Sequence, residues 1–448
     1  MSKYKSKYKG YPTYKGSGVE WIGEVPEHWE VKPAYAVAIV RNGYPFKSEL
    51  FKREGVESDR LIRIRDIAGD DESIFTKEVC PDSATISNGD VLIGMDGDFN
   101  VHRWRRGPAK LNQRMCAASG RTEAITQFLS RCLPTPLRVI NDLAYATTVK
   151  HLSSYEILHT RIAVPPTHEL TNINVVLDRE TTRIDALITK KTRFIELLKE
   201  KRSALITHAV TKGLDPNVKM KDSGVEWIGE VPEGWEVKRL RHIASFKNSN
   251  VDKKSYEGQG AVNLCNYTDV YYNEFITSDM SFMPATASSS EIAQFALKKG
   301  DVIITKDSED PSDIGIPAVV AEDLPGVVCG YHLTMIRVAD FDTARVLHRS
   351  LQSHPTQAHF FVEAPGITRY GLGQDAIGDL HVCVPPEPER GNLADQIDRE
   401  TARIDALVAK VQRSIDLLKE RRSALITAAV TGQVDLRESE SMYKEARA

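Results

Sequence analysis

The sequence has no paired cysteines and none of the short motifs that mark common catalytic sites. Its six cysteines are scattered without a CxxC pair or a close histidine. This argues against zinc, redox and disulfide frameworks and predicts buried thiols. The phosphate loop GxxxxGK[ST], HExxH, GxSxG and the [DN]PP[YF] tetrapeptide of amino-methyltransferases are all missing. We therefore expect a chain that is not an enzyme by itself.

Long apolar runs and a strong charge of one sign are also lacking. No segment approaches the roughly 18 apolar residues of a membrane-spanning helix. Residues 1–15 alternate lysine and tyrosine without the apolar core of a signal peptide, so we expect a cytoplasmic protein. The net charge of −3 neither attracts nor excludes nucleic acid globally, and any DNA-binding surface must be local.

What the 448 residues do contain is a duplication. Residues 17–32 and 223–238 read SGVEWIGEVPEHWEVK and SGVEWIGEVPEGWEVK and differ at one position. We call this block the tag. Residues 177–215 and 397–435 share 26 of 39 residues, and Gly-Asp-Val-Leu-Ile at 89–93 is echoed at 300–304. The period is far too long for a solenoid, so we expect two half-molecules related by a pseudo-two-fold axis.

The second repeated block carries an apolar seam. Its seam positions step by four and three from Ile184 to Ala209 and from Ile404 to Ala429, with Arg202 and Arg422 at the same register. A proline precedes each block and a glycine follows it, as expected for helices. A helix of about 60 Å with such a seam needs a partner, so we expect the two copies to pack on each other, antiparallel. The alternative is that each seam docks only on its own globular domain.

The segments between the repeated blocks contain short β-rich runs broken by turns. We expect strands at 90–95, 162–165, 301–305, 317–321 and 380–385. Mixed α/β domains fit these runs best. The two segments share little beyond the turn glycine and aspartate, which indicates two recognition units of different specificity on one scaffold.

This order of motifs resembles the specificity subunit of a Type I restriction-modification system over about residues 11–437. The resemblance is carried by the tags, by DRET and RSALIT in both helices, and by GDVLIGMDGDFN (89–100), LNQRMC (111–116), TVKHLSS (148–154), ITKDSEDPSDIGIP (304–317) and TRYGLGQDAI (368–377). The chain departs from the family at the helix starts, where Asn172, Asn174 and Gly391 lower helix propensity.

The resemblance implies an α/β fold with two mixed α/β target-recognition domains, separated by two long helices that form an antiparallel intramolecular coiled coil. The implied division is an N-terminal arm and tag (1–29), target-recognition domain 1 (30–166), spacer helix 1 (167–212), linker and second tag (213–235), target-recognition domain 2 (236–386), spacer helix 2 (387–431) and a C-terminal tail (432–448).

The resemblance also implies the partners. Each domain would read one half of a bipartite site in double-stranded DNA, and the helices would dock two methyltransferase subunits that methylate adenine at N6. Restriction and translocase subunits would join the complex, without any membrane. No cofactor or metal is expected in this chain, while S-adenosylmethionine, ATP and Mg²⁺ are expected in the partner subunits.

A basic cluster points to DNA independently of the resemblance. Arg103, Arg105 and Arg106 flank Trp104, and such a cluster suits phosphate contacts. The alternative is a solvated basic loop. The predicted DNA-binding residues of the first domain are Met95, Asp96, Asp98, Asn100, Arg103, Arg105, Arg106, Lys110, Asn112, Gln113, Arg114, Lys150 and His151. Those of the second domain are Lys306, Asp307, Ser308, Glu309, Tyr331, His332, Thr368, Arg369 and Tyr370.

Three further features leave alternatives open. Asp96 and Asp98 lack the third carboxylate of a metal loop, which favours a tight turn or a loop near DNA. The tag tryptophans Trp21, Trp29, Trp227 and Trp235 either staple each tag to the helix ends, the preferred interpretation, or form an interaction surface. The predicted partner-docking residues of the helices are Arg183, Asp185, Lys199, Arg202, Arg403, Asp405, Lys419 and Arg422. The alternative is that these charges only suit solvation and the helix dipole.

The sequence thus predicts a non-catalytic DNA-recognition subunit. One rival is a DNA methyltransferase or nuclease in its own right, which predicts activity of the purified chain alone. Another is a scaffold whose helices hold two modules that do not bind DNA, which predicts no binding to any duplex.

Overall fold

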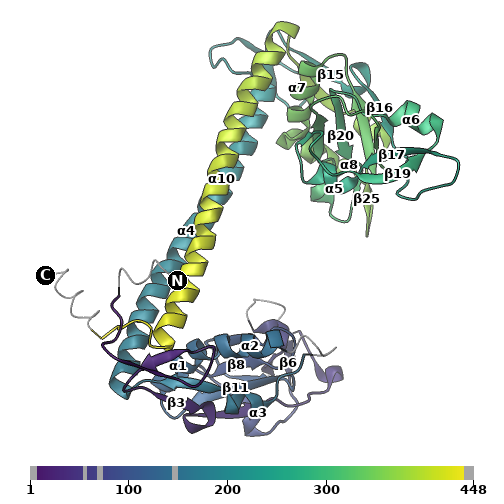
Figure 1. The fold of residues 1–448 in the computed structure, drawn as a ribbon. Coiled ribbons are helices and arrows are strands. Elements are labelled where there is room, and N and C mark those ends of the chain that lie inside the picture. Colours follow the sequence, from purple (N-terminus) through teal and green to yellow (C-terminus); the bar gives the residue numbers. More distant parts are fainter. Residues whose placement is uncertain (1–7, 54–57, 68–73, 144–149, 438–448) are drawn as a thin grey trace. The chain divides into compact units, whose positions relative to one another are not determined.

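The computed structural model describes residues 8–53, 58–67, 74–143 and 150–437, and the chain divides into two compact units. Unit 1 comprises Met1–Lys190 with Ser414–Ala448, and unit 2 comprises Lys191–Arg413. Each unit combines a mixed α/β domain with part of both long helices (Figure 1). The long helices are α4 (Thr167–Lys212) and α10 (Glu387–Val430).

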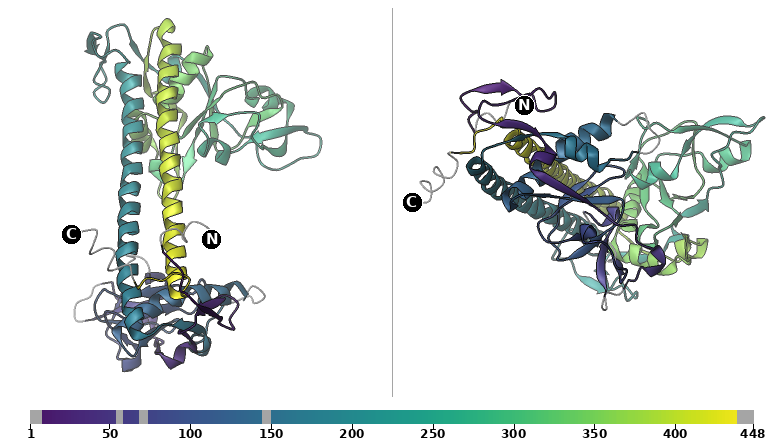
Figure 2. Two further views of the ribbon diagram at one scale, coloured as in Figure 1. Left: turned by 60° about the vertical axis from the view of Figure 1, so that its left-hand side comes forward. Right: turned by 90° about the horizontal axis from the view of Figure 1, so that it is seen from below.

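In each unit the segments of α4 and α10 lie side by side and run in opposite directions (Figure 2). In unit 1, Arg422 Nε donates to Asp185 Oδ1 at 2.9 Å. The repeat-equivalent pair closes unit 2, where Arg202 Nε donates to Asp405 Oδ1 at 2.9 Å. These pairs confirm the predicted antiparallel coiled coil, and seam residues such as Ile184, Ile195 and Ile415 are buried.

Asn172, Asn174 and Gly391, which have low helix propensity, lie inside α4 and α10 and do not delay the start of either helix. Asn174 is buried, and its Nδ2 donates to the carbonyl of Ala124 at 2.8 Å. A Cβ at position 391 would lie 2.9 Å from Asp342 Oδ2, so a larger residue there would require the Asp342 side chain to move. Tertiary packing overrides the low intrinsic helix propensity of these residues.

Two four-stranded sheets form the domain of unit 1. The main sheet has the antiparallel order β4-β11-β8-β9, with bounds Ala38–Asn42, Met115–Gly120, Val91–Gly94 and Val101–Arg103. The second has the order β6-β5-β10-β7, with bounds Ile74–Thr76, Asp59–Ile62, Ala109–Leu111 and Thr85–Ile86. The helices are α1 (Glu123–Cys132), α2 (Pro134–Leu143) and α3 (Ser154–His159). Strand β12 (Arg161–Val164) pairs with β3 (Glu30–Pro33), and β1 (Tyr14–Gly16) with β2 (Glu24–Pro26).

Unit 2 repeats this framework, with one strand more in its main sheet and one fewer in its second sheet. Its main sheet has the order β16-β24-β20-β22-β18, with bounds Ser245–Asn248, Leu333–Arg337, Asp301–Thr305, Pro317–Val320 and Phe275–Ile276. The second has the order β19-β17-β23, with bounds Met283–Ala287, Gly260–Cys265 and Val327–Cys329. Two-stranded pairs are β15 (Glu236–Arg239) with β26 (His381–Val384), β13 (Met220–Asp222) with β14 (Glu230–Pro232), and β21 (Asp307–Ser308) with β25 (Tyr370–Gly371). The helices are α5 (Tyr267–Tyr271), α6 (Ser289–Phe295), α7 (Phe341–Leu351), α8 (His354–Glu363) and α9 (Gln374–Gly378).

The echoed Gly-Asp dipeptide is a structural turn at the start of the central strand in both units. Gly89 and Gly300 have φ angles of 105° and 88°, a region that favours glycine. The buried aspartate that follows is held by an arginine, since Arg41 donates to Asp90 at 2.6 Å and Arg337 donates to Asp301 at 2.6 Å. The dipeptide therefore positions β8 and β20.

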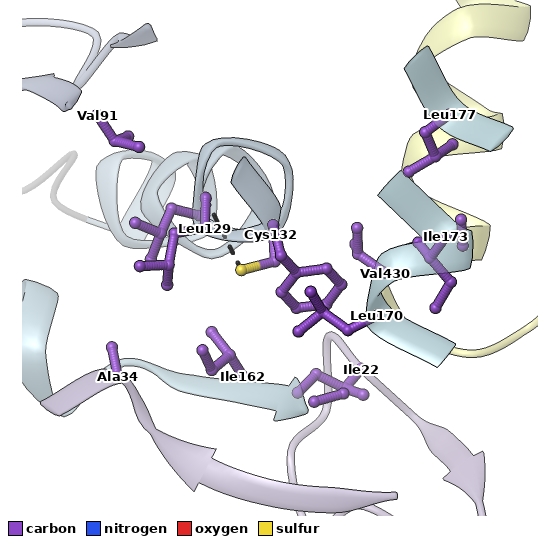
Figure 3. Packing of buried hydrophobic residues seen from close by; sticks show 14 of the residues in the cluster. Ile22, Ala34, Val91, Leu129, Cys132, Ile162, Leu170, Ile173, Leu177 and Val430 are labelled. Carbon is purple, nitrogen blue, oxygen red and sulfur yellow. Dashed lines mark hydrogen bonds between the residues drawn. The ribbon is translucent and has the colours of Figure 1, made fainter. Parts of the chain in front are cut away.

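Buried apolar residues join α4 to the domain of unit 1. Figure 3 shows Leu170, Ile173 and Leu177 of α4 facing the core that contains Cys132 of α1. Five of the six cysteines are buried and Cys80 is partly buried, close to the prediction of buried thiols. Within the described part of the chain, no helix is long and apolar enough to span a bilayer.

The first tag is fastened to the start of α4 by a buried carboxylate. Glu169 is 1% exposed and accepts hydrogen bonds from Trp29 Nε1 at 2.9 Å and Tyr11 Oη at 3.2 Å. His28 Nε2 lies 2.6 Å from the other oxygen of Glu169. Burial and the charge of Glu169 raise the pKa of Tyr11, which therefore stays a hydrogen-bond donor.

The second tag repeats this contact closer to solvent. Trp235 Nε1 donates to Glu389 Oε2 at 3.0 Å, and Glu389 is exposed. The staple interpretation is therefore confirmed for Trp29 and Trp235. Trp227 is 41% exposed and stacks on His359, and Trp21 is only partly buried, so these two tryptophans do not hold a helix start in this way.

Replacing the two stapling tryptophans should have unequal effects. We expect Trp29→Phe to lower the free energy of unfolding by about 1–3 kcal/mol, because a buried carboxylate loses a donor. Trp235→Phe should cost less than about 1 kcal/mol, because water can replace the lost donor to Glu389. Urea denaturation of both variants measures the difference, and equal losses would contradict the proposed role of burial.

Candidate nucleic-acid interface

Three predicted residues meet beyond the end of strand β8 in unit 1. The segment before α3 pairs with this end, since Leu152 N donates to the carbonyl of Met95 at 2.7 Å. Asp96 Oδ1 lies 2.8 Å from His151 Nδ1, and Asp96 Oδ2 lies 3.4 Å from an Nη of Arg114. We call Asp96, Arg114 and His151 the first sheet-end cluster.

Unit 2 has a matching cluster at the same end of its sheet. Asp307 Oδ2 lies 2.8 Å from His332 Nδ1, and Arg369 donates to Asp307 Oδ1 at 2.7 Å. We call Asp307, His332 and Arg369 the second sheet-end cluster. Leu372 N donates to the carbonyl of Lys306 at 2.7 Å, as Leu152 does to Met95.

Strand register shows which members of the two clusters are equivalent. Met115 faces Gly94 in unit 1, and Leu333 faces Thr305 in unit 2. The residues before these strands, Arg114 and His332, are therefore equivalent, and each contacts the aspartate that follows the central strand. His332 has a φ of 73°, a strained backbone conformation for a residue with a Cβ.

Each cluster presents hydrogen-bond donors held in place by a partly buried carboxylate. The side chains of Arg114 and Arg369 are 68% and 57% exposed, whereas those of Asp96 and Asp307 are 25% and 15% exposed. The hydrogen bond to Asp307 raises the pKa of Arg369, so this guanidinium keeps its charge. Fixed arginine and histidine donors suit base edges or phosphate oxygens.

An aromatic face lies beside the second sheet-end cluster. The Tyr331 ring lies 3.8 Å from the His332 ring, and Lys306 Nζ lies 5.1 Å from the Tyr331 centroid. Tyr331 is 45% exposed, so it offers a surface on which a base or sugar could pack.

The other predicted residues divide between surface and interior. Met95 is 7% exposed and lies in the apolar core, and Lys110 is 9% exposed. Lys110 Nζ donates to the carbonyl of Glu78 at 2.6 Å and pairs with Asp59 at 2.9 Å. These two side chains therefore pack within the domain, whereas the prediction had placed them on a DNA-binding surface. Exposed or partly exposed are Asp98, Asn100, Asn112, Gln113, Lys150, Ser308, Glu309, Thr368 and Tyr370.

The basic cluster around Trp104 does not lie with the first sheet-end cluster. Arg103 pairs across the sheet with Val91, at the start of β8, whereas Asp96 follows its end. The five residue-to-residue steps from Val91 to Asp96 correspond to about 16 Å along a strand. Trp104 is fully buried, and the guanidinium of Arg106 lies 5.0 Å from its ring centroid.

Arg103, Arg105 and Arg106 line a separate groove of about 630 Å³ in unit 1. Its other side is formed by Arg131 of α1, by α4 and by Arg422 of α10. We call this space the arginine groove. The basic cluster is thus neither an extension of the sheet-end cluster nor a simple solvated loop.

At the equivalent place, unit 2 holds a closed ion-pair network. Arg349 of α7 is 2% exposed and pairs with Asp398 at 2.7 Å and with Glu274 at 2.8 Å. Arg202 pairs with the other oxygen of Glu274 at 2.5 Å. Although burial opposes its charge, Arg349 and Arg202 lower the pKa of Glu274 to about 2.

Sequence reasoning missed Arg131, Arg349, Asp178 and Glu274. Asp178 and Asp398 are the aspartates of the repeated DRET block, and this repetition was the available signal. The arginines lie in the diverged segments, where only the fold shows that Arg131 and Arg349 occupy the same place on α1 and α7.

Five of the predicted partner-docking residues bind within the chain. Arg202 with Asp405, and Arg422 with Asp185, join the two long helices within each unit. Arg403 pairs with Glu400 along its own helix at 2.6 Å. Arg183, Lys199 and Lys419 are exposed, in keeping with either docking or solvation.

The described residues contain no group of three or more histidine, cysteine, aspartate or glutamate side chains suited to a metal ion. Asp96 instead binds His151 and Arg114. The interpretation of residues 95–99 as a turn beside a candidate interface therefore fits better than a metal loop.

Comparisons with known proteins agree with this organisation. Residues 26–197 match the family described as Type I restriction modification DNA specificity domain. The chain is 24% identical over 411 residues to the Type I restriction enzyme EcoBI specificity subunit of Escherichia coli, covering 89% of this chain and 85% of that protein. It is 23% identical over 295 residues to the MjaVIII specificity subunit of Methanocaldococcus jannaschii, covering 62% of this chain and 64% of that protein.

A solved structure shares the fold. A chain from a structure of the complex assembly and conformational transition of the type I R-M system superposes with a TM-score of 0.67. The superposition covers 91% of this chain and 98% of that chain at 15% identity.

The network around Glu274 should make stability depend on pH. We expect Glu274→Gln to lower the free energy of unfolding at pH 7 by about 2 kcal/mol, a value discounted for the partial exposure of this side chain. Because the folded-state pKa is depressed, the loss should be complete above about pH 5 and should fade as pH falls from about 4.5 towards 2. Urea denaturation at several pH values measures it. Glu309→Gln, an exposed glutamate of the same unit, is the control, and a pH-independent loss in Glu274→Gln would contradict the charge-based account.

Proposed function

Since this chain belongs to the specificity subunits of Type I restriction-modification systems, which recognise DNA and are not catalytic, we propose that its two sheet-end clusters each read one half of a bipartite DNA site. The half-sites would be read in double-stranded DNA. Adenine-N6 methylation and restriction would be carried out by partner subunits. The rival functions, a stand-alone DNA methyltransferase or nuclease and a scaffold without DNA, find no support among the relatives.

One observation carries this proposal: the same place in both units holds a cluster of the same design with different side chains. An aspartate follows the central strand in each case, but its partners are Arg114 and His151 in unit 1 and His332 and Arg369 in unit 2. Two equivalent sites that offer different donors suit two different half-sites.

Exchange of one aspartate should disturb one half of the recognition site. We expect Asp96→Ala and Asp307→Ala each to release two donors from their fixed positions and to weaken methylation about 10-fold or more, with relaxed base preference in one half-site. Single-molecule sequencing of N6-methyladenine in a host that carries the partner subunits measures this.

The host without this gene is the reference, and loss of a split methylation motif there tests the function itself. Asp82→Ala, at an exposed aspartate outside the clusters, is the control variant. A variant that disturbs both half-sites equally, or neither, would speak against separate reading by the two clusters.

We further propose that the long helices dock two copies of a methyltransferase subunit. Leu187 and Leu407 are 40% and 38% exposed at equivalent repeat positions, and Leu197 and Leu417 are 46% and 65% exposed at another pair. Each unit therefore offers the same two exposed leucines. Exposed large apolar side chains at matched positions support two equal protein contacts.

Charging one leucine pair should remove one methyltransferase copy. We expect Leu187→Asp with Leu417→Asp to lose one copy, and Leu407→Asp with Leu197→Asp to lose the other, because a charge in an apolar contact is costly. Native mass spectrometry of the co-expressed complex counts the copies. Val79→Asp, at an exposed apolar residue outside the helices, serves as the control. Retention of both copies in either double variant would exclude this docking surface.

The cofactors follow from the same assignment. We place S-adenosylmethionine in the methyltransferase subunits, and ATP with Mg²⁺ in the translocase and nuclease subunits. This chain would supply recognition and assembly without a cofactor of its own.

A further inference from the structure

The arginine groove of unit 1 is lined by more arginines than carboxylates. Five arginines line it, namely Arg103, Arg105, Arg106, Arg131 and Arg422. Two carboxylates line it, Asp178 and Asp185. Each is already bound, Asp178 to Arg131 at 2.5 Å and Asp185 to Arg422 at 2.9 Å.

Burial opposes the positive charge of two arginines of the groove, Arg103 and Arg131. Arg103 pairs with Glu123 through one Nη, but its Nε is buried without a hydrogen-bond partner in the described part of the chain. Burial and the neighbouring Arg105 lower the pKa of Arg103. Burial also lowers the pKa of Arg131, and Arg103 and Arg422 add to this against the attraction of Asp178. The groove would therefore gain from an added negative charge.

Unit 2 shows what fills the equivalent place. Arg349 and Arg202 are the counterparts of Arg131 and Arg422, and the carboxylate of Glu274 lies between them at 2.8 and 2.5 Å. In contrast to Arg131, Arg202 has a raised pKa, because the attraction of Glu274 and Asp405 outweighs the effect of burial. Both units thus contain the same arginine pair, and among the described residues only unit 2 has a glutamate between the two guanidinium groups.

The difference arises from one strand. Glu274 directly precedes β18, the fifth strand of the unit 2 sheet, and Val319 of β22 donates to its carbonyl at 2.9 Å. The sheet of unit 1 ends at β9, where Arg103 occupies the position of Val319. Among the described residues of unit 1, no carboxylate takes the place of Glu274, and Arg103 lies at the strand position of Val319.

We propose that the arginine groove binds a phosphate group of the DNA backbone at the place that the Glu274 carboxylate occupies in unit 2. This rests on the proposed function. A single carboxylate would lie between Arg131 and Arg422, whereas successive phosphates of a DNA strand can also lie near the exposed Arg105. The planar guanidinium groups match phosphate oxygens in geometry, and hydroxyl groups of Ser130, Thr182 and Ser423 in the lining can donate further hydrogen bonds.

The test fills the groove with a carboxylate, as unit 2 does by itself. Thr182 is exposed in the groove wall, and its repeat equivalent in unit 2 is Ala402. We expect Thr182→Glu, in the full chain assembled with its methyltransferase partners, to weaken binding to a duplex with the recognised site about 10-fold. The slope of log affinity against log salt should fall by about 0.9 for each DNA phosphate that the variant no longer binds. Ala402→Glu is the matched control and should leave affinity and slope unchanged.

A second variant and a second probe keep the result interpretable. Arg105→Ala removes an exposed arginine of the groove and should reduce the slope by up to about 0.9 while leaving the thermal midpoint unchanged. Inorganic phosphate alone, titrated into the same complex by calorimetry, separates a free-phosphate site from a DNA contact.

The outcomes are distinct. A reduced affinity and a reduced slope in Thr182→Glu and Arg105→Ala support the inference. An unchanged slope in both, with the wild-type complex binding DNA, overturns it and leaves the proposed function intact. Saturable inorganic phosphate without any slope change assigns the groove to free phosphate and overturns the DNA contact. Loss of a methyltransferase subunit at unchanged DNA affinity assigns the groove to an acidic protein segment and overturns the inference as well. No DNA binding by the wild-type complex refutes the proposed function itself.

Discussion

The antiparallel pairing of α4 and α10 is the constraint on which the rest of the molecule depends. A helix of 46 residues with an apolar seam is not stable alone in water, and the only seam of matching register in this chain belongs to its repeat. Arginine at one seam position would be costly in such a contact. It is accommodated because the partner helix places an aspartate opposite, Asp405 for Arg202 and Asp185 for Arg422. The same pair in both units ties each half of one helix to the opposite half of the other.

The domains are attached to this helical pair by polar contacts that are buried to different degrees. Glu169 at the start of α4 is surrounded by Trp29, Tyr11 and His28, whereas Glu389 at the start of α10 keeps only the tryptophan among these donors. The tags differ at one position, His28 against Gly234, and this histidine is one of the donors that unit 2 lacks. The two tags are nearly identical in sequence, but the contact to Glu169 is buried in unit 1 and the contact to Glu389 is exposed to solvent in unit 2, because the surroundings of the tags differ.

The proposed DNA contacts lie in two regions, the sheet-end clusters of both units and the arginine groove of unit 1. The sheet-end clusters hold donors on a rigid strand end, where a partly buried aspartate reduces their freedom before any ligand arrives. The region between the domain and the long helices is closed by Glu274 in unit 2 and open in unit 1. The duplication therefore preserved the framework, including the Gly-Asp turn and the arginine of α1 and α7, while an added strand changed the charge balance at one of the two equivalent places.

The sequence by itself determined the long helices, their antiparallel pairing, the tags and the subunit family, because periodic and repeated patterns are local and can be read without coordinates. It also indicated Asp96, Arg114 and His151, and Asp307, His332 and Arg369, as candidates, but not that they form two equivalent clusters. Only the tertiary structure decided that, because β8, β11 and the segment before α3 meet through strand pairing between residues far apart in the chain. The structure also shows that Lys110 and Met95 are buried and that the arginines around Trp104 lie in a different region from Asp96. The sequence could not show this, because burial and the direction of a strand are set by the whole sheet and not by neighbouring residues.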